Sequence, residues 1–132
     1  MSATKISSFY GPLEGMRILV VEDEALISML LEDELRCAGA EIVGPAVSVA
    51  EALELIEIAY GDGGLNAAVL DINLNGEMVL PVADRLAALH VPFVFTTGYA
   101  DKGYQGRYEA APMLLKPFNC DVLPDAVKRL LF

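Results

Sequence analysis

Four short apolar runs in this chain each end at a polar residue, and this pattern constrains the fold more than any other feature. The runs and the residues that end them are 18–21 before Glu22 and Asp23, 67–70 before Asp71, 93–95 before Thr96 and Thr97, and 113–115 before Lys116. Runs of this length, separated by helical patterns, predict buried parallel strands. Because open α/β sheets bind ligands at the carboxyl ends of their strands, the pattern brings three carboxylates, a hydroxyl and an ammonium to one edge. Such a set suits a divalent cation and a phosphoryl group.

Helical patterns alternate with the runs along the chain. They cover residues 24–38, 48–60, 78–89 and 121–131, and a less regular strand over 41–47 is broken by Gly44-Pro45, which suits an edge position. Ser48 begins the second helix, and Glu51 three residues later completes a capping box. Residues 98–112 hold three glycines and little apolar periodicity, so any helix there is short. The alternation predicts an α/β fold with a right-handed, doubly wound parallel sheet and helices on both faces.

Length and charge restrict the function. A chain of 132 residues is one ordinary domain, which we assign to residues 16–132 behind a flexible arm over 1–15. A net charge of −10 argues against direct nucleic-acid binding, because little in the chain would neutralise phosphates. No apolar stretch is long enough to span a membrane, and no secretory signal precedes the first run, so we expect a cytoplasmic protein. We also expect it to be a monomer or weak homodimer. Cys37 and Cys120 match no metal-site spacing and are expected to be buried or partly buried free thiols.

With these residues placed, residues 16–132 resemble the receiver domain of two-component response regulators. The matching motifs are Glu22-Asp23, Asp71 followed by Ile-Asn-Leu-Asn-Gly, Thr97 followed by a small residue, and Lys116-Pro117-Phe118. The resemblance implies a flavodoxin-like five-stranded sheet of order 2-1-3-4-5. The stretch from Phe95 to Gly98 is also similar to a receiver subgroup with Phe-Ala-Thr-Gly at that strand end, although Thr96 replaces the alanine.

The resemblance also implies the site chemistry. Asp71 is the phosphoacceptor, supplied by a histidine kinase or a histidine phosphotransfer protein. Mg²⁺ is the implied cofactor, with a ligand set of Asp23, Asp71, the backbone carbonyl of Asn73 and, through water, Glu22. Lys116 pairs with the acceptor and then with the phosphoryl group, and Thr97 bonds a phosphoryl oxygen. A cis Lys116-Pro117 bond aims the lysine inward.

One residue departs from the receiver pattern. Many receivers carry an aromatic residue three positions before the lysine, which moves together with the threonine, whereas this chain has Met113 there. A thioether fills space in several rotamers but offers no phenol to bond. The switch candidates are therefore Thr97, Met113 and Tyr99, which lies just past Gly98 and shields the phosphoryl site or only caps the sheet.

We interpret the chain as a single-domain receiver, not an enzyme acting on other molecules, because it ends directly after the last helix. It would signal through protein contacts to an unknown downstream protein. One alternative is a small Mg²⁺-dependent phosphatase of the haloacid dehalogenase type, which needs a second Asp where this chain has Asn73. The other is a degenerate receiver used only for binding, which the intact Asp71, Lys116 and Thr97 disfavour.

The first helix provides a candidate docking surface for the phosphoryl donor. Its core face is expected to consist of Ile27, Leu30, Leu31, Leu35 and Ala38. Leu26 and Met29 are left over near Asp23, either as simple rim residues or as the centre of an apolar patch for the donor's helices.

Overall fold

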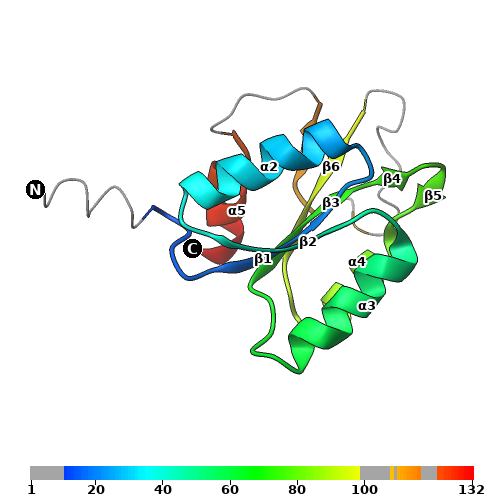
Figure 1. Cartoon of the computed structure of the whole chain (residues 1–132), viewed down its shortest axis with the longest axis horizontal. Coiled ribbons are helices and arrows are strands. Elements are labelled where there is room, and N and C mark those ends of the chain that lie inside the picture. The colour runs from blue at the N-terminus through cyan, green and yellow to red at the C-terminus, as the bar shows by residue number, and fades with distance from the viewer. Residues whose placement is uncertain (1–10, 99–107, 109, 117–121) are drawn as a thin grey trace, which may run out of the picture.

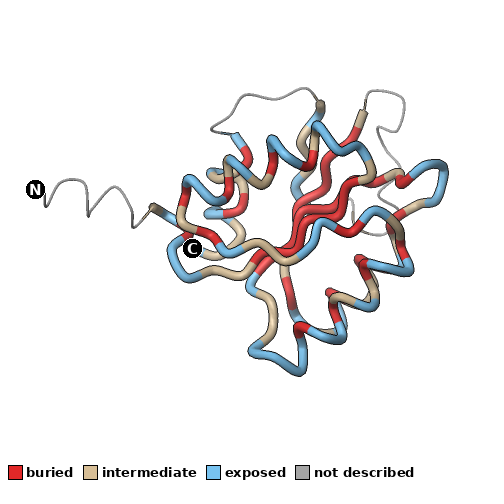
Figure 2. Tube along the Cα trace, viewed as in Figure 1, coloured by how far each residue is buried: buried red, intermediate tan, exposed pale blue. Residues whose placement is uncertain are grey.

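A computed structural model of the chain describes residues 11–98, 108, 110–116 and 122–132, and its centre is a five-stranded parallel sheet (Figure 1). The strands are β1 (Arg17–Val21), β2 (Glu41–Ala46), β3 (Ala67–Asp71), β6 (Phe93–Thr97) and β7 (Met113–Leu115). Their order is β2-β1-β3-β6-β7. Because β6 and β7 are the fourth and fifth strands of this sheet along the chain, the predicted order 2-1-3-4-5 is confirmed. The sheet is flavodoxin-like, and β3 and β6 are buried along their whole length (Figure 2).

In the described part of the chain, two helices cover each face of the sheet (Figure 1). On one face lie α2 (Ala25–Cys37) and α5 (Val122–Leu131), and on the other lie α3 (Val49–Tyr60) and α4 (Leu80–Ala88). Alternate strand residues enter separate cores, since Ile18 and Val20 pack with α2 and α5 while Leu19 and Val21 pack with α3 and α4. Burial on both faces explains why the strands read as continuous apolar runs.

Local signals fix several of the element ends. The Ser48 hydroxyl accepts a hydrogen bond from the Glu51 N–H at 3.1 Å, and the Glu51 carboxylate accepts one from the Val47 N–H at 2.8 Å. The predicted start of α3 is therefore confirmed. At the edge of the sheet, the Gly44-Pro45 peptide is cis and the β1–β2 register is irregular, in agreement with the predicted edge position of β2.

The predicted arm over residues 1–15 is wrong at its carboxyl end. Leu13 is fully buried in the core between α2 and α5, and its N–H donates to the carbonyl oxygen of Ala38 at 2.8 Å. Gly39 has φ +102, and a Cβ there would lie 2.9 Å from the backbone of Glu14, so the close approach of the two segments needs glycine. Residues 1–10 lie outside the described part of the chain.

The expected loop after β3 is a small antiparallel hairpin, with β4 (Asn73–Leu74) pairing with β5 (Glu77–Met78). Its turn is Asn75-Gly76, both at positive φ, which is the combination that two-residue hairpins favour. Because the hairpin extends to Met78, α4 begins at Leu80, two residues later than predicted.

Two packing expectations also change. Leu30, assigned to the core face of α2, is 56% exposed, and Cys37, expected to be buried or partly buried, is exposed. Most of the segment 98–112 lies outside the described residues, so its predicted short helix is not described. Among the described residues, no helix is both long and apolar enough to cross a membrane.

Candidate functional site

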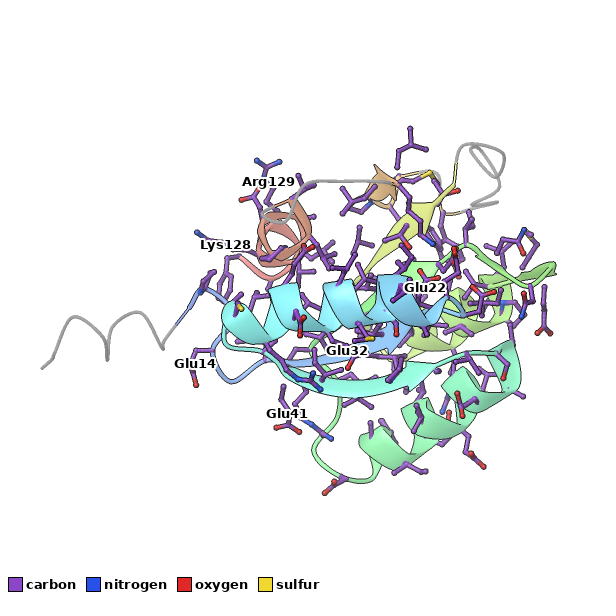
Figure 3. The ribbon with its side chains drawn as sticks, turned by 45° about the horizontal axis from the view of Figure 1, so that its top comes forward. Glu14, Glu22, Glu32, Glu41, Lys128 and Arg129 are labelled. Carbon is purple, nitrogen blue, oxygen red and sulfur yellow. The ribbon has the colours of Figure 1, made fainter. Side chains whose placement is uncertain are left out.

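The carboxyl edge of the sheet brings together the acidic residues that the sequence predicts to meet. Asp71 is the last residue of β3, and Glu22 and Asp23 directly follow β1, the neighbouring strand. One carboxylate oxygen from each of the three lies within 4.8 Å of the others. Figure 3 shows Glu22 beside the amino-terminal end of α2. The predicted convergence of these three acids is present in the structure.

Lys116, the first residue after β7, supplies the positive charge of this cluster. Its ammonium Nζ lies 2.8 Å from Glu22 Oε1, 3.2 Å from Asp71 Oδ2 and 3.9 Å from Glu24 Oε1. Burial alone would lower the pKa of Lys116, but the hydrogen bonds and negative charges of Glu22 and Asp71 raise it above its usual value. The lysine is therefore charged and partly neutralises the two buried carboxylates.

The Asp71 carboxyl group lies in surroundings that disfavour its ionised form. Burial raises its pKa to about 7, and the negative charge of Glu22 acts in the same direction. The Lys116 ammonium and the Asn73 N–H, which donates to Asp71 Oδ1 at 3.3 Å, oppose the rise only in part. A further positive charge at this position would stabilise the ionised carboxylate.

A polar pocket of about 430 Å³ gives access to the cluster. Among its lining residues are Asp23, Glu24, Asp71, Asn73, Asn75 and Lys116. The three carboxylates supply the hard oxygen ligands that a small divalent cation prefers. The pocket beside them has room for bound water, which matters because Mg²⁺ keeps several waters and takes few protein ligands. The donor set therefore fits the implied ion.

The hydroxyl of Thr97 is bonded to the backbone and not to the acidic cluster. Thr97 is fully buried, and its Oγ1 donates to the carbonyl oxygen of Gly98 at 2.9 Å. The Asn73 side chain accepts a hydrogen bond from the Gly76 N–H at 2.6 Å, which holds the hairpin next to Asp71. The structure thus brings Asn73 to the pocket but leaves Thr97 bonded elsewhere.

Of the other two predicted switch residues, only Met113 belongs to the described part of the chain. Met113 is half-buried and packs against the core between the sheet and α3 and α4. Tyr99 and the Lys116-Pro117 bond lie outside the described residues.

Sequence reasoning missed one residue of the site and one residue that packs against the core. Glu24 lines the pocket, and its N–H donates to Glu22 Oε2 at 3.1 Å; the run of three acids from Glu22 was the available signal. Tyr108 packs edge-on against Phe93 at a ring distance of 5.3 Å, and its hydroxyl donates to Asp84 Oδ1 at 2.6 Å. No periodic pattern in the glycine-containing segment pointed to that tyrosine.

The first turns of α2 carry an exposed apolar patch, which consists of Leu26, Met29 and Leu30. Their exposed fractions are 76%, 58% and 56%. Leu26 and Met29 thus lie outside the core, as predicted, and Leu30 joins them. Neighbouring large exposed apolar side chains are a common mark of interaction surfaces.

Comparison with known proteins identifies the family. No protein-family model matches the chain. PdtaR, a transcriptional regulatory protein of Mycobacterium tuberculosis, is 33% identical over 116 residues, which cover 85% of this chain and 55% of PdtaR. The phyllosphere-induced regulator PhyR of Methylorubrum extorquens is 30% identical over 129 residues, covering 87% of this chain and 43% of PhyR. The chain thus spans about half the length of these curated relatives.

Solved structures give the same result, and two of them match this chain over nearly their whole length. SdrG of Sphingomonas melonis is 45% identical with a TM-score of 0.77, and the match covers 92% of this chain and 99% of SdrG. The response regulator receiver domain of PhyR from Erythrobacter litoralis has a TM-score of 0.77 at 29% identity, covering 92% of this chain and 94% of that one. These matches give no support to the phosphatase alternative. From its sheet order, its acidic edge and these relatives, the chain belongs to the receiver-domain family of response regulators.

Proposed function

We propose that this domain accepts one phosphoryl group on Asp71, from a histidine kinase or a histidine phosphotransfer protein, and then signals through altered protein contacts. The observation that carries the proposal is the Asp71 carboxylate, which lines a polar pocket with the Lys116 ammonium 3.2 Å away and two further acids beside it. Phosphoryl transfer needs a positioned nucleophile and compensation of charge, and these groups supply both.

The transfer forms one bond and breaks one. An Asp71 carboxylate oxygen attacks the phosphorus of a phosphohistidine, the P–N bond breaks, and the imidazole leaves with the electron pair. A bound Mg²⁺, held by Asp23, Asp71, the Asn73 carbonyl and, through water, Glu22, would neutralise charge on the phosphoryl oxygens. Lys116 pairs with the phosphoryl group as a point charge, and Thr97 gives up its bond to Gly98 to donate to a phosphoryl oxygen.

The direct test supplies the domain with acetyl phosphate and Mg²⁺ and follows the intact protein mass. We expect a single phosphoryl group per chain, which is lost in alkali because it is an acyl phosphate. Multiple turnover of a generic phosphoester such as p-nitrophenyl phosphate, with no stable phosphoprotein, would instead support the phosphatase.

Mg²⁺ should stabilise the fold, because it binds only where the folded chain brings the acids together. Millimolar Mg²⁺ is expected to raise the melting temperature of the wild type and to raise that of Asp23→Ala much less. Asp62→Ala removes an exposed acid far from the cluster and serves as the matched control, with a shift equal to that of the wild type. Equal shifts in all three proteins would place the metal elsewhere.

We also propose that the exposed apolar patch of α2 receives the phosphoryl donor, since it lies next to Asp23. Apolar anchors at the centre of an interface commonly contribute more than about 1 kcal/mol each. Leu26→Ala and Met29→Ala are therefore expected to slow phosphotransfer from the partner at least severalfold. Phosphorylation by acetyl phosphate, which needs no docking surface, should hardly change.

Ile58→Ala provides the matched control for docking, because Ile58 is an equally exposed apolar residue on α3, on the other face of the sheet. It should leave both reactions unchanged. Equal slowing of both donors by the α2 variants would mean that the patch belongs to the fold or the site, and no slowing would place docking elsewhere.

A further inference from the structure

Neighbouring strands contribute a single row of side chains to the face of the sheet that α2 and α5 cover. Val21 pairs with Leu70, so Glu22 follows opposite Asp71, and Asp71 pairs directly with Thr96. Side chains paired across parallel strands point to the same face of the sheet. Thr96 also lies two residues after Val94, which packs in the core with α2 and α5. Thr96 is thus the neighbour of the acceptor on the same face.

Lys116 has to cross this row to reach Asp71. Thr96 pairs with Leu114, and Lys116 follows two residues later, so it starts on the same face but on the far side of β6. Because β6 lies between β7 and β3, an ammonium 3.2 Å from Asp71 Oδ2 places the lysine stem across the carboxyl end of β6. Thr96 is the last residue of β6 on that face.

The hydroxyl of Thr96 has no hydrogen-bond partner among the described residues, although the residue is fully buried. The hydroxyl of the next residue, Thr97, is bonded to Gly98. Burying an unpaired hydroxyl destabilises a fold, and alanine at this position would avoid that cost. An unpaired buried group calls for an explanation, and a partner that arrives in another state of the protein is one.

We propose that Thr96 is a positioning residue for Lys116 in the phosphorylated domain, an inference that rests on the proposed function. In this structure the Lys116 ammonium lies 2.8 Å from Glu22 Oε1 as an ion pair and donates a hydrogen bond to Asp71 Oδ2 at 3.2 Å. A phosphoryl group on Asp71 draws the ammonium away from Glu22. The Thr96 hydroxyl then accepts a hydrogen bond from the ammonium and holds it on the phosphoryl oxygens.

The inference predicts opposite effects of one hydroxyl in two states. Thr96→Val keeps the shape and removes the hydroxyl, so it should raise the melting temperature of the unphosphorylated domain. The same variant should lower the rate of phosphorylation by acetyl phosphate and the affinity for beryllofluoride with Mg²⁺, an acyl phosphate mimic, each by about tenfold to a hundredfold, the effect of one hydrogen bond to a charged group. Thr96→Ser keeps the hydroxyl and should restore both values to within twofold.

If Thr96 served only the fold, Thr96→Val would change the melting temperature and leave the phosphorylation rate and the beryllofluoride affinity unchanged. The inference is overturned if Thr96→Val matches the wild type in rate and beryllofluoride affinity, or if Thr96→Ser loses as much as Thr96→Val. The Mg²⁺-induced shift in melting temperature should be equal in all three proteins, because Thr96 is not a ligand. If the wild type itself takes up neither phosphate nor beryllofluoride, the proposed function fails, and the role of Thr96 fails with it.

Discussion

Asp71→Asn should abolish phosphorylation by both the histidine donor and acetyl phosphate. The substitution keeps the size of the side chain but removes the nucleophilic oxygen, and we expect no acyl phosphate by intact mass after prolonged incubation. Asp62→Asn, the same substitution at an exposed turn, should be phosphorylated like the wild type. Alkali-labile phosphate on Asp71→Asn would mean that another residue is the acceptor.

The same substitution should stabilise the metal-free domain in a pH-dependent way. Since the pKa of Asp71 is raised from 3.8 to about 7, the folded protein holds a proton between these values that the unfolded chain has released. The free energy of unfolding therefore falls as pH rises from about 4 to about 7. Asp71→Asn lacks this titration, so its gain in melting temperature over the wild type should be larger at pH 8 than at pH 4. An equal gain at both pH values would contradict the raised pKa.

The strand ends were predictable because their chemistry is local. A buried apolar run that stops at Asp71 or Lys116 fixes both the strand and the edge at which its polar residue lies. Ser48 and Glu51 likewise fix the start of α3 within four residues of chain. The convergence of the acids then follows from the order of the strands alone.

Contacts between distant segments were not predictable from the same patterns. Leu13 lies in an aperiodic stretch and is buried only because the chain passes beside the end of α2. Tyr108 reaches Asp84 on α4 from a segment without helical periodicity. The direction of the Thr97 hydroxyl depends on one side-chain torsion, which no sequence pattern encodes.

Lys116→Ala should destabilise the metal-free domain by about 3 kcal/mol at pH 8, the usual cost of removing one partner from a buried ion pair. The reason is that Glu22, which is almost fully buried, and Asp71 would both lose their counter-charge. Denaturant unfolding in the presence of a chelator measures the effect. Lys128→Ala removes an exposed lysine from α5 (Figure 3) and should leave the stability within about 0.5 kcal/mol of the wild type.

The same variant separates metal binding from phosphoryl transfer. Because the ammonium competes with a cation for the oxygens of Glu22 and Asp71, Lys116→Ala should bind Mg²⁺ more tightly, on the order of tenfold. Its phosphorylation by acetyl phosphate should nevertheless slow by about a hundredfold, the usual effect of losing one positioned charge on the transferred group. Titration calorimetry and the intact-mass assay measure the two quantities on one sample. If Mg²⁺ affinity and phosphorylation fell together, the lysine would be holding the acids in place and would have no separate part in the transfer.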